Sequence, residues 1–404
     1  MSKISELTDD LLVKILSFLP TKVAVSTSVL SKQWEFLWMW LPNLKYFDYK
    51  DLNSNHTESS LLGYHDFIYK NLPLHRAPII ESLRLKFYYA LSRPEDIKLF
   101  VGIAVSRRVR KLSISYNYFG DKCQILLPSS LYTCKSLMTL KLYGKTILVD
   151  VPPTICLLPS LKTLELGWVT YLNEDSLGLL LSHCPVLEDL SIKRGYNDNV
   201  KALVVVVPSL QRLSIHIYSG CSSDDGYVIV TPSLKYFKLL DSRDCLSYLI
   251  EHMPELEEAD INVKQNPDKL LVSITSIKRL SLNVFNSQEE PGYHAGIVFN
   301  HLEHLELCIS NNYGYKLLVR LLKDSPKLRV LSICVHIDIQ SGEYQPDIDF
   351  HGLTSLEGSS VPKCLLNSLE TLDVQGYKGS LEERDFLSFI FKHAAHLKSS
   401  SISQ

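Results

Sequence analysis

A short apolar pattern recurs along most of the chain. It consists of an apolar residue, two variable residues, a second apolar residue, one variable residue and a third apolar residue, as in the phrases that begin at Ser136 and Ser160. Its last part alternates apolar and polar positions, which is the periodicity of a β-strand with one buried face. The leading apolar residues follow one another at intervals of 21 to 26 residues, and they are Leu137, Leu161, Leu187, Leu210, Leu234, Leu256, Ile277, Leu302 and Leu328.

Intervals of roughly 20–29 residues are typical of leucine-rich repeats. One such repeat cannot bury its own apolar face, but stacked repeats build a continuous core. We therefore predict an α/β fold, a leucine-rich-repeat solenoid over residues 79–354, with a curved parallel sheet and with helices and irregular returns on its convex side. Short helices are expected over 174–185, 243–254 and 315–326, where apolar residues at helical spacing end in a proline, whereas 219–232 is polar and expected to be irregular.

The first 48 residues follow a helical pattern instead. Apolar residues at steps of three and four form one helix face, and they are Leu7, Leu11, Leu12, Ile15, Leu16 and Leu19. Pro20 ends this helix, while Thr8 and Thr21 are placed to cap it and the next one. A third piece contains Trp34, Phe36, Leu37, Trp38 and Trp40. We predict a small all-α module of three helices over residues 1–48 and a linker over residues 49–78 that enters the solenoid.

This module carries more apolar surface than so few residues can bury by themselves. Exposed leucine and tryptophan side chains are typical anchors of protein interfaces. The module therefore either docks on a partner or covers the open end of the first repeat. The residues alone leave these two interpretations level.

Residues 4–44 closely resemble the F-box of plant F-box/leucine-rich-repeat proteins, whose pattern is roughly LPDDLLxxILSxLPTKxxxxTSxLSKRWxxLW. The chain has Thr8 where that family usually has proline and Gln33 where it usually has arginine. The resemblance implies that the module binds a Skp-type adaptor and, through it, a cullin scaffold. It also implies which residues face the adaptor, and these would be Leu7, Leu11, Leu12, Ile15, Leu16, Leu19, Trp34, Leu37 and Trp38.

Residues 355–404 resemble the FBD domain that closes many of the same plant chains. The resemblance includes Pro362, Cys364 and Glu383, and two glycines at 376 and 379. We expect one more repeat strand, a turn at 376–379 and a helix from about Leu381 with Phe386, Phe389, Ile390 and Ala394 on one face. Because the terminal repeat of a solenoid needs a cover, we interpret this segment as a C-terminal cap.

Composition and charge narrow the class of partner. The net charge of −2 over 404 residues gives no electrostatic reason to bind nucleic acid, and we interpret the basic run at 107–111 as a solvated face. The longest apolar stretch, 202–207, is far shorter than the roughly 18 residues of a membrane span. The nine cysteines contain no CxxC pair and are expected to be reduced. We expect a location in the cytoplasm or the nucleus, without nucleic-acid or membrane partners.

No motif for catalysis, metal binding or cofactor binding stands out. The chain lacks a glycine-rich phosphate loop and a GxSxG sequence, and its spaced histidine pairs at 301/304 and 393/396 lack further ligands. The resemblance therefore implies a non-catalytic substrate-recognition subunit of an SCF-type (Skp/cullin/F-box) ubiquitin ligase, whose repeat surface binds an unknown target protein. Two alternatives stay open: an F-box co-receptor for a hormone or another small molecule, and a repeat scaffold with a degenerate F-box.

Overall fold

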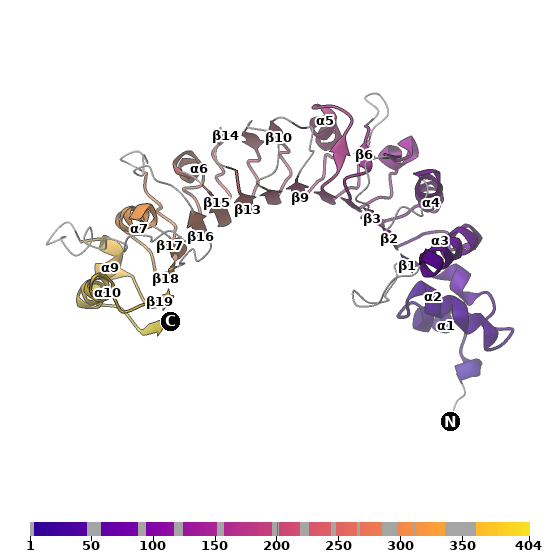
Figure 1. Ribbon diagram of the computed structural model, residues 1–404, viewed down its shortest axis with the longest axis horizontal. Coiled ribbons are helices and arrows are strands. Elements are labelled where there is room, and N and C mark those ends of the chain that lie inside the picture. Colours follow the sequence, from indigo (N-terminus) through magenta and orange to yellow (C-terminus); the bar gives the residue numbers. More distant parts are fainter. Residues whose placement is uncertain are drawn as a thin grey trace. The chain divides into compact units, whose positions relative to one another are not determined.

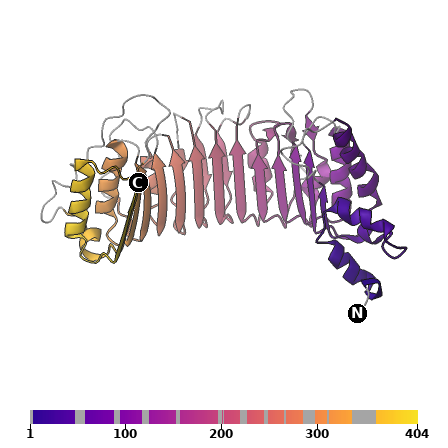
Figure 2. The ribbon, with the colours of Figure 1, turned by 60° about the horizontal axis from the view of Figure 1, so that its bottom comes forward.

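The computed structural model of the chain divides into two compact units, Met1–Val200 and Lys201–Gln404. Each unit contains a parallel sheet with helices and short strands packed on one of its faces (Figures 1 and 2). We call the opposite face of each sheet its open face. The structure describes residues 4–46, 58–87, 94–116, 124–151, 157–195, 200, 202–218, 226–243, 248–264, 267–284, 297–309, 312–335 and 361–404.

The parallel sheet of the N-terminal unit takes its strands from successive repeats. Its strands, in spatial order, are β1 (Asn43–Tyr46), β2 (Ser82–Phe87), β3 (Lys111–Tyr116), β5 (Thr139–Tyr143), β7 (Thr163–Gly167) and β9 (Asp189–Arg194). Alternate residues of each strand are buried, and equivalent leucines lie side by side in register: Leu83, Leu112, Leu140, Leu164 and Leu190. This row of leucines is the core that no single repeat is able to form.

The face of this sheet that carries these leucines is covered by an outer layer of return segments. Its helices are α3 (Glu58–Asn71), α4 (Pro94–Ser106) and α5 (Ser176–Ser182), with 3-10 helices at Leu72–Leu74 and Ser129–Thr133. A small second sheet in this layer consists of β4 (Ile125–Leu126), β6 (Ile147–Val149) and β8 (Thr170–Tyr171). Phe100, Ile147 and Leu180 of this layer are buried, so it closes the core from outside.

The C-terminal unit repeats the same arrangement. The strands of its parallel sheet are β11 (Arg212–Ile217), β13 (Tyr236–Asp241), β15 (Glu258–Val263), β16 (Arg279–Val284), β17 (His304–Ile309), β18 (Val330–Val335), β19 (Thr371–Gln375) and β20 (Ser399–Ser403). Its outer layer contains α6 (Asp268–Ser273), α7 (Asn312–Asp324), α9 (Lys363–Asn367) and α10 (Leu381–His393), and a small sheet of β10 (Leu203–Val206), β12 (Tyr227–Val230) and β14 (Tyr248–Ile250).

The predicted fold class, a parallel sheet of repeat strands with helices and irregular returns behind it, is confirmed. Helix α5 lies within the predicted range 174–185, and α7 overlaps the predicted range 315–326 but begins earlier, at Asn312. The helix predicted over 243–254 is wrong, because β14 forms there and pairs with β12, a strand within the stretch expected to be irregular. Strands this short carry too few residues for periodicity to distinguish them from helix.

The C-terminal segment has the strand, turn and helix that the sequence predicted. A capping box begins α10, in which Ser380 accepts the backbone N–H of Glu383. The buried carboxylate of Glu383 in turn accepts the backbone N–H groups of Lys378, Gly379 and Ser380 at 3.1, 2.7 and 3.0 Å. Gly376 has φ +79°, and a Cβ there would lie 2.3 Å from the carbonyl oxygen of Val335, so this turn requires glycine.

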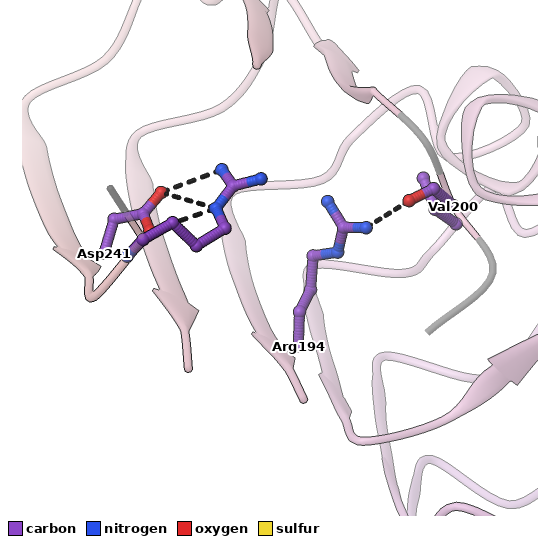
Figure 3. A network of polar contacts seen from close by, with 4 residues as sticks. Arg194, Val200 and Asp241 are labelled. Carbon is purple, nitrogen blue, oxygen red and sulfur yellow. Dashed lines mark hydrogen bonds and ion pairs between the residues drawn. The ribbon is translucent and has the colours of Figure 1, made fainter. Parts of the chain in front are cut away.

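Buried charged groups fix the chain beyond two of the repeat strands (Figure 3). In the C-terminal unit, Arg243 Nη2 lies 2.8 Å from Asp241 Oδ2, and both side chains are almost fully buried. The Arg243 guanidinium also lies 5.4 Å from the ring centroid of Tyr227 in the outer sheet. In the N-terminal unit, the buried guanidinium of Arg194 donates to the carbonyl oxygen of Val200. Each arginine therefore ties the end of a strand to the segment that follows it.

Breaking the buried pair should cost far more stability than breaking an exposed one. Asp241→Ala leaves the Arg243 charge buried without its carboxylate, which typically costs about 3–5 kcal/mol. Asp260→Ala removes the partly exposed pair of Lys238 and Asp260, worth less than about 1 kcal/mol. Urea unfolding followed by far-UV circular dichroism should show a large fall in midpoint for the first variant and a small one for the second. Equal shifts would contradict this role of Asp241.

Candidate docking surface on the N-terminal module

The N-terminal module consists of short helices packed on one another. They are a 3-10 helix at Ile4–Glu6, α1 (Asp9–Leu16), α2 (Thr21–Ser26) and 3-10 helices at Thr27–Val29 and Leu37–Trp40. The predicted third helix is thus a single 3-10 segment, and it packs against α1. Thr8 occupies the N-cap position of α1, but its side chain makes no capping hydrogen bond.

The sequence predicted that Thr21 caps α2, and this prediction is wrong. Pro20 is the N-cap residue of the helix, and Thr21 is its first helical residue. The Thr21 side chain is buried, and its Oγ1 accepts the backbone N–H of Lys45 at 2.8 Å. Lys45 belongs to β1, which lies inside the range predicted to be all-α and begins the parallel sheet. The module is therefore joined directly to the first repeat strand.

The residues predicted to face an adaptor differ in exposure. Five of them are buried within the module, and they are Leu12, Leu16, Trp34, Leu37 and Trp38. Leu7 and Leu19 are half-buried, whereas Leu11 and Ile15 are exposed on α1. Trp34 and Trp38 thus belong to the core of the module itself, so that the apolar surface available to a partner comes from other side chains.

Three exposed apolar residues form a stripe along α1 and its C-terminal turn. Leu11, Ile15 and Phe18 follow at helical spacing, and their exposed fractions are 47%, 38% and 79%. We call these three residues the docking stripe. The module exposes further large apolar side chains, which are Ile4, Val23, Val29, Leu30, Phe36 and Trp40. Apolar groups exposed in such number on one small module mark a surface for a protein partner.

Sequence reasoning did not select Phe18, the most exposed member of the docking stripe. The signal was present, because Phe18 lies seven residues after Leu11 and therefore on the same helix face. The leucines at 12, 16 and 19 lie on a neighbouring face of the same helix. Since all these positions are apolar, the pattern alone did not show which face is buried.

Gln33 ties the third part of the module to the start of α1. Its Nε2 donates to the carbonyl oxygen of Leu7 and to Oδ1 of Asp9, each at 3.2 Å. The residue stands where the family pattern has arginine, and its side chain reaches the carboxylate at the helix N-terminus. The departure at position 33 removes a charge, and the glutamine present there hydrogen-bonds to the start of α1.

Backbone hydrogen bonds join the module to the repeats that follow. The carbonyl oxygen of Met39 accepts the N–H groups of Arg76 and Ala77 at 2.7 and 3.2 Å. The carbonyl oxygen of Pro42 accepts the N–H of Glu81 at 2.8 Å, next to β2. The predicted linker, where the structure describes it over residues 58–78, forms α3 and a 3-10 helix. The module is therefore held against the first repeats at several points.

His75 makes a buried contact at this junction. Its Nε2 lies 2.7 Å from the carbonyl oxygen of Leu41, which requires the neutral ring to donate from Nε2. Its Nδ1 is buried and has no hydrogen-bond partner among the described residues. Burial, together with the nearby charge of Arg107, lowers the pKa of His75 to about 4, although the Leu41 hydrogen bond acts in the opposite direction.

The described residues offer little else that resembles a reactive site. Within them, no group of three or more His, Cys, Asp or Glu side chains is arranged to hold a metal ion. The cysteines that the structure describes are free thiols, at Cys134, Cys184, Cys308, Cys334 and Cys364. Among the helices in the described ranges, none is both long enough and apolar enough to cross a membrane.

Comparison with known proteins identifies the family. Family models match as an F-box domain over residues 4–52, as the leucine-rich repeats of the FBD-associated F-box protein At5g56370 over 100–261, and as an FBD over 357–402. The FBD-associated F-box protein At5g56700 of Arabidopsis thaliana is 62% identical over 404 residues, which cover 100% of this chain and 98% of that protein. The chain belongs to the family of FBD-associated F-box proteins.

Other FBD-associated F-box proteins of Arabidopsis thaliana are similar along the whole chain. At5g60610 is 54% identical over 405 residues and covered completely in both chains. At4g10400 is 48% identical over 405 residues, which cover 100% of this chain and 92% of that protein. The resemblances stated for the F-box, the repeats and the FBD segment are confirmed.

The contact made by Gln33 predicts how little its departure from the family pattern matters. Gln33→Arg should form an ion pair with Asp9 and raise the stability of the F-box by less than about 1 kcal/mol, because the pair is exposed. Gln33→Ala removes both hydrogen bonds and should lower stability by about 1 kcal/mol. Tryptophan fluorescence during urea unfolding measures both changes, since Trp34 and Trp38 lie in the F-box core. Greater stability of Gln33→Ala would contradict this role.

His75 makes the stability of the N-terminal unit depend on pH. The pKa in the folded chain is below the ordinary value of 6.5, so the unfolded chain binds more protons between these values. The contribution of neutral His75 to the free energy of unfolding is complete above pH 6.5 and is lost as the pH falls toward 4. Between pH 7 and pH 5 the His75-dependent loss should be about 2 kcal/mol. Urea midpoints followed by tryptophan fluorescence should fall over this range, and His75→Gln should remove most of the fall. An unchanged pH dependence in this variant would contradict the assignment.

Proposed function

We propose that this chain is the substrate-recognition subunit of an SCF-type ubiquitin ligase. Its F-box binds a Skp-type adaptor and, through it, a cullin scaffold, while the open face of the repeats binds a target protein. The chain contributes no bond-making residue, and transfer of ubiquitin takes place on enzymes that the scaffold brings close. The observation that carries the proposal is the docking stripe, exposed on an F-box whose own core is already complete.

The completeness of that core matters for the interpretation of the stripe. Leu12, Leu16, Trp34 and Trp38 are all less than about one-tenth exposed, so the module does not need Leu11, Ile15 or Phe18 for its own packing. Burying a large apolar side chain completely contributes roughly 1.5–3 kcal/mol. A partner that covers the docking stripe therefore gains several kilocalories per mole from these side chains without disturbing the F-box.

The junction between the F-box and the repeats supports a role in holding a bound target close to the ligase. Hydrogen bonds from 76, 77 and 81 to carbonyl groups of the F-box segment hold the first repeats at a fixed distance from the docking stripe. A target bound to these repeats would be held at a defined place relative to the adaptor, which raises the effective concentration of its lysines near the ubiquitin-loaded enzyme. In this role the chain would act in the cytoplasm or the nucleus.

The adaptor contact is tested by matched leucines on two helices of the same unit. Leu11 of α1 and Leu99 of α4 are 47% and 43% exposed. Leu11→Asp should weaken binding of a purified Skp-type adaptor by at least about 30-fold, because it puts a charge into the centre of the contact. Leu99→Asp should leave the affinity within about 2-fold of that of the unaltered chain. Isothermal titration calorimetry with the full chain measures these affinities.

Two results would overturn the proposed function: no binding of the adaptor by the unaltered chain, or the same affinity in both variants. Circular dichroism of each variant shows whether its fold is intact. Buried positions such as Leu16 are unsuitable for this test, because a charge there would unfold the F-box whether or not it binds an adaptor.

A further inference from the structure

The open face of the N-terminal unit contains a hollow over β2, β3, β5 and β7. Its volume is about 440 Å³. Among the described residues that line it, Arg84, Lys86, Lys111 and Lys141 are cationic and Glu165 is the sole acidic group, so the lining carries a net charge of about +3 at neutral pH. Serine and threonine hydroxyls lie between the cationic side chains. We call this site the basic hollow.

The one carboxylate of the basic hollow is already engaged by its neighbours. Lys141 Nζ and the Tyr143 hydroxyl both donate to Glu165. Partial burial opposes ionisation, but these hydrogen bonds outweigh it and hold the pKa of Glu165 below its usual value. Glu165 therefore neutralises Lys141, whereas no carboxylate among the described residues pairs with Arg84 of β2 or Lys111 of β3.

Two ion pairs elsewhere on the open faces join adjacent strands. Lys238 of β13 pairs with Asp260 of β15, and Arg279 of β16 lies 2.6 Å from Glu258 of β15. Charged side chains on neighbouring strands of a sheet stabilise it when their signs are opposite. These pairs obey the rule that neighbouring charges on a sheet have opposite signs.

The basic hollow departs from this rule at its F-box end. Lys45 of β1 lies directly opposite Arg84 of β2, and both side chains are exposed. Lys111 of β3 lies diagonally across from Arg84, because its register partner is Ser82. Within the described residues, neither Arg84 nor Lys111 forms an ion pair. Like charges side by side destabilise a sheet, so this cluster is a feature that folding alone does not favour.

We propose that the basic hollow binds the target protein through a short extended segment rich in carboxylate or phosphate groups. This inference rests on the proposed function, since it names the chemistry of the target that the open face would hold. The hollow crosses three strand intervals, a distance of about 14 Å, which an extended peptide spans with about four residues. The serine positions give its backbone room to approach the sheet, while the cationic side chains on either side reach its acidic groups.

An exposed tryptophan lies at the edge of the basic hollow. Trp168 follows β7, is 41% exposed and has φ +54°, a conformation that is costly for a bulky residue. Its ring centroid lies 6.4 Å from that of Tyr143, which lines the hollow, and 5.8 Å from Lys193 Nζ. Tryptophan is enriched among the residues that anchor protein interfaces. Trp168 would bind an apolar side chain next to the acidic segment.

Glycines create the space for this aromatic pair. A Cβ on Gly167 would lie 2.3 Å from the ring of Tyr143, and a Cβ on Gly195 would lie 2.9 Å from the ring of Trp168. The Tyr143 ring is thereby able to lie over β7 and bring its hydroxyl to Glu165. The two aromatic rings are held by the backbone and not by a deep apolar pocket, so their exposed surfaces stay available.

A nucleic acid fits the open faces less well than an acidic peptide. Binding along a phosphate backbone requires a continuous basic stripe. The open face of the C-terminal unit instead carries Asp260, Glu306 and Asp373 at the middle positions of its strands. A short acidic segment needs no more than the cluster of cations in the basic hollow.

The test measures binding of labelled peptides to the full chain by fluorescence anisotropy. The probes are peptides of about nine residues with a central glutamate-rich segment and a flanking leucine, a copy with phosphoserines in place of the glutamates, and a copy with glutamines. Glutamate or phosphoserine peptides should bind, the glutamine copy should not, and about 500 mM salt should weaken binding. Whichever of the two acidic peptides binds more tightly identifies the anion that the target supplies.

Charge-reversal variants locate the contact. Arg84→Glu with Lys111→Glu should weaken acidic-peptide binding by at least about 10-fold. Lys98→Glu with Lys135→Glu changes the net charge by the same amount at exposed positions of the same unit, outside the hollow. This control variant should change the affinity for the acidic peptides by less than about 2-fold. Trp168→Ala should lower affinity for the peptide with the flanking leucine more than for one with glycine there.

Several outcomes would overturn the proposal. They are no binding of either acidic peptide, equal loss in the two charge-reversal variants, and competition by inorganic pyrophosphate or by a single-stranded RNA of equal charge at concentrations as low as those of the peptide itself. Adaptor affinity, measured on the same variants, separates this proposal from the proposed function. The variant Arg84→Glu with Lys111→Glu should bind the adaptor normally. If the unaltered chain binds the acidic peptides but no adaptor, the proposed function is overturned and peptide binding by the basic hollow still holds.

Discussion

The structure depends on the burial of one row of side chains that no repeat is able to bury alone. Leu83, Leu112, Leu140, Leu164 and Leu190 lie side by side on successive strands of the N-terminal unit, and each is covered by its neighbours and by the outer layer. Because the inward positions are committed to this core, the alternate positions are free to vary in charge and size without loss of the fold. These alternate positions form the open face, and the basic hollow is one arrangement of side chains that their freedom to vary permits.

The F-box segment takes part in the same sheet through β1. Strand β1 leaves the F-box segment and pairs with β2, and Thr21 of α2 accepts a hydrogen bond from the backbone of β1. The docking and capping interpretations of the first residues are therefore compatible. One side of the F-box segment continues into the first repeats, while the docking stripe on α1 stays exposed for the adaptor that we propose.

Much of the fold could be predicted from the sequence because its pattern is repeated. Each repeat has the same alternation of apolar and polar residues, so a weak copy is recognised by comparison with the others. The helix at 381–393 was predicted because its apolar face and its capping residues are both evident in the sequence. The short strands β12 and β14 were missed because their few apolar residues fit helix and strand equally. Two of the three residues of the docking stripe, Leu11 and Ile15, were predicted to face the adaptor, but the sequence did not distinguish them from nearby leucines that are buried. The basic hollow was not foreseen, because Arg84, Lys111 and Lys141 come together only when the register of three repeats is known.

The most direct test of the central claim is hydrogen–deuterium exchange of the full chain with and without a purified Skp-type adaptor. If the docking stripe is the adaptor site, slower exchange should be confined to α1, α2 and the 3-10 helices of the F-box, and the strands β2 to β7 should exchange as before. Protection spread over the open face, or no change in α1 when the adaptor is in excess, would contradict the claim that this chain joins a ubiquitin ligase through its F-box.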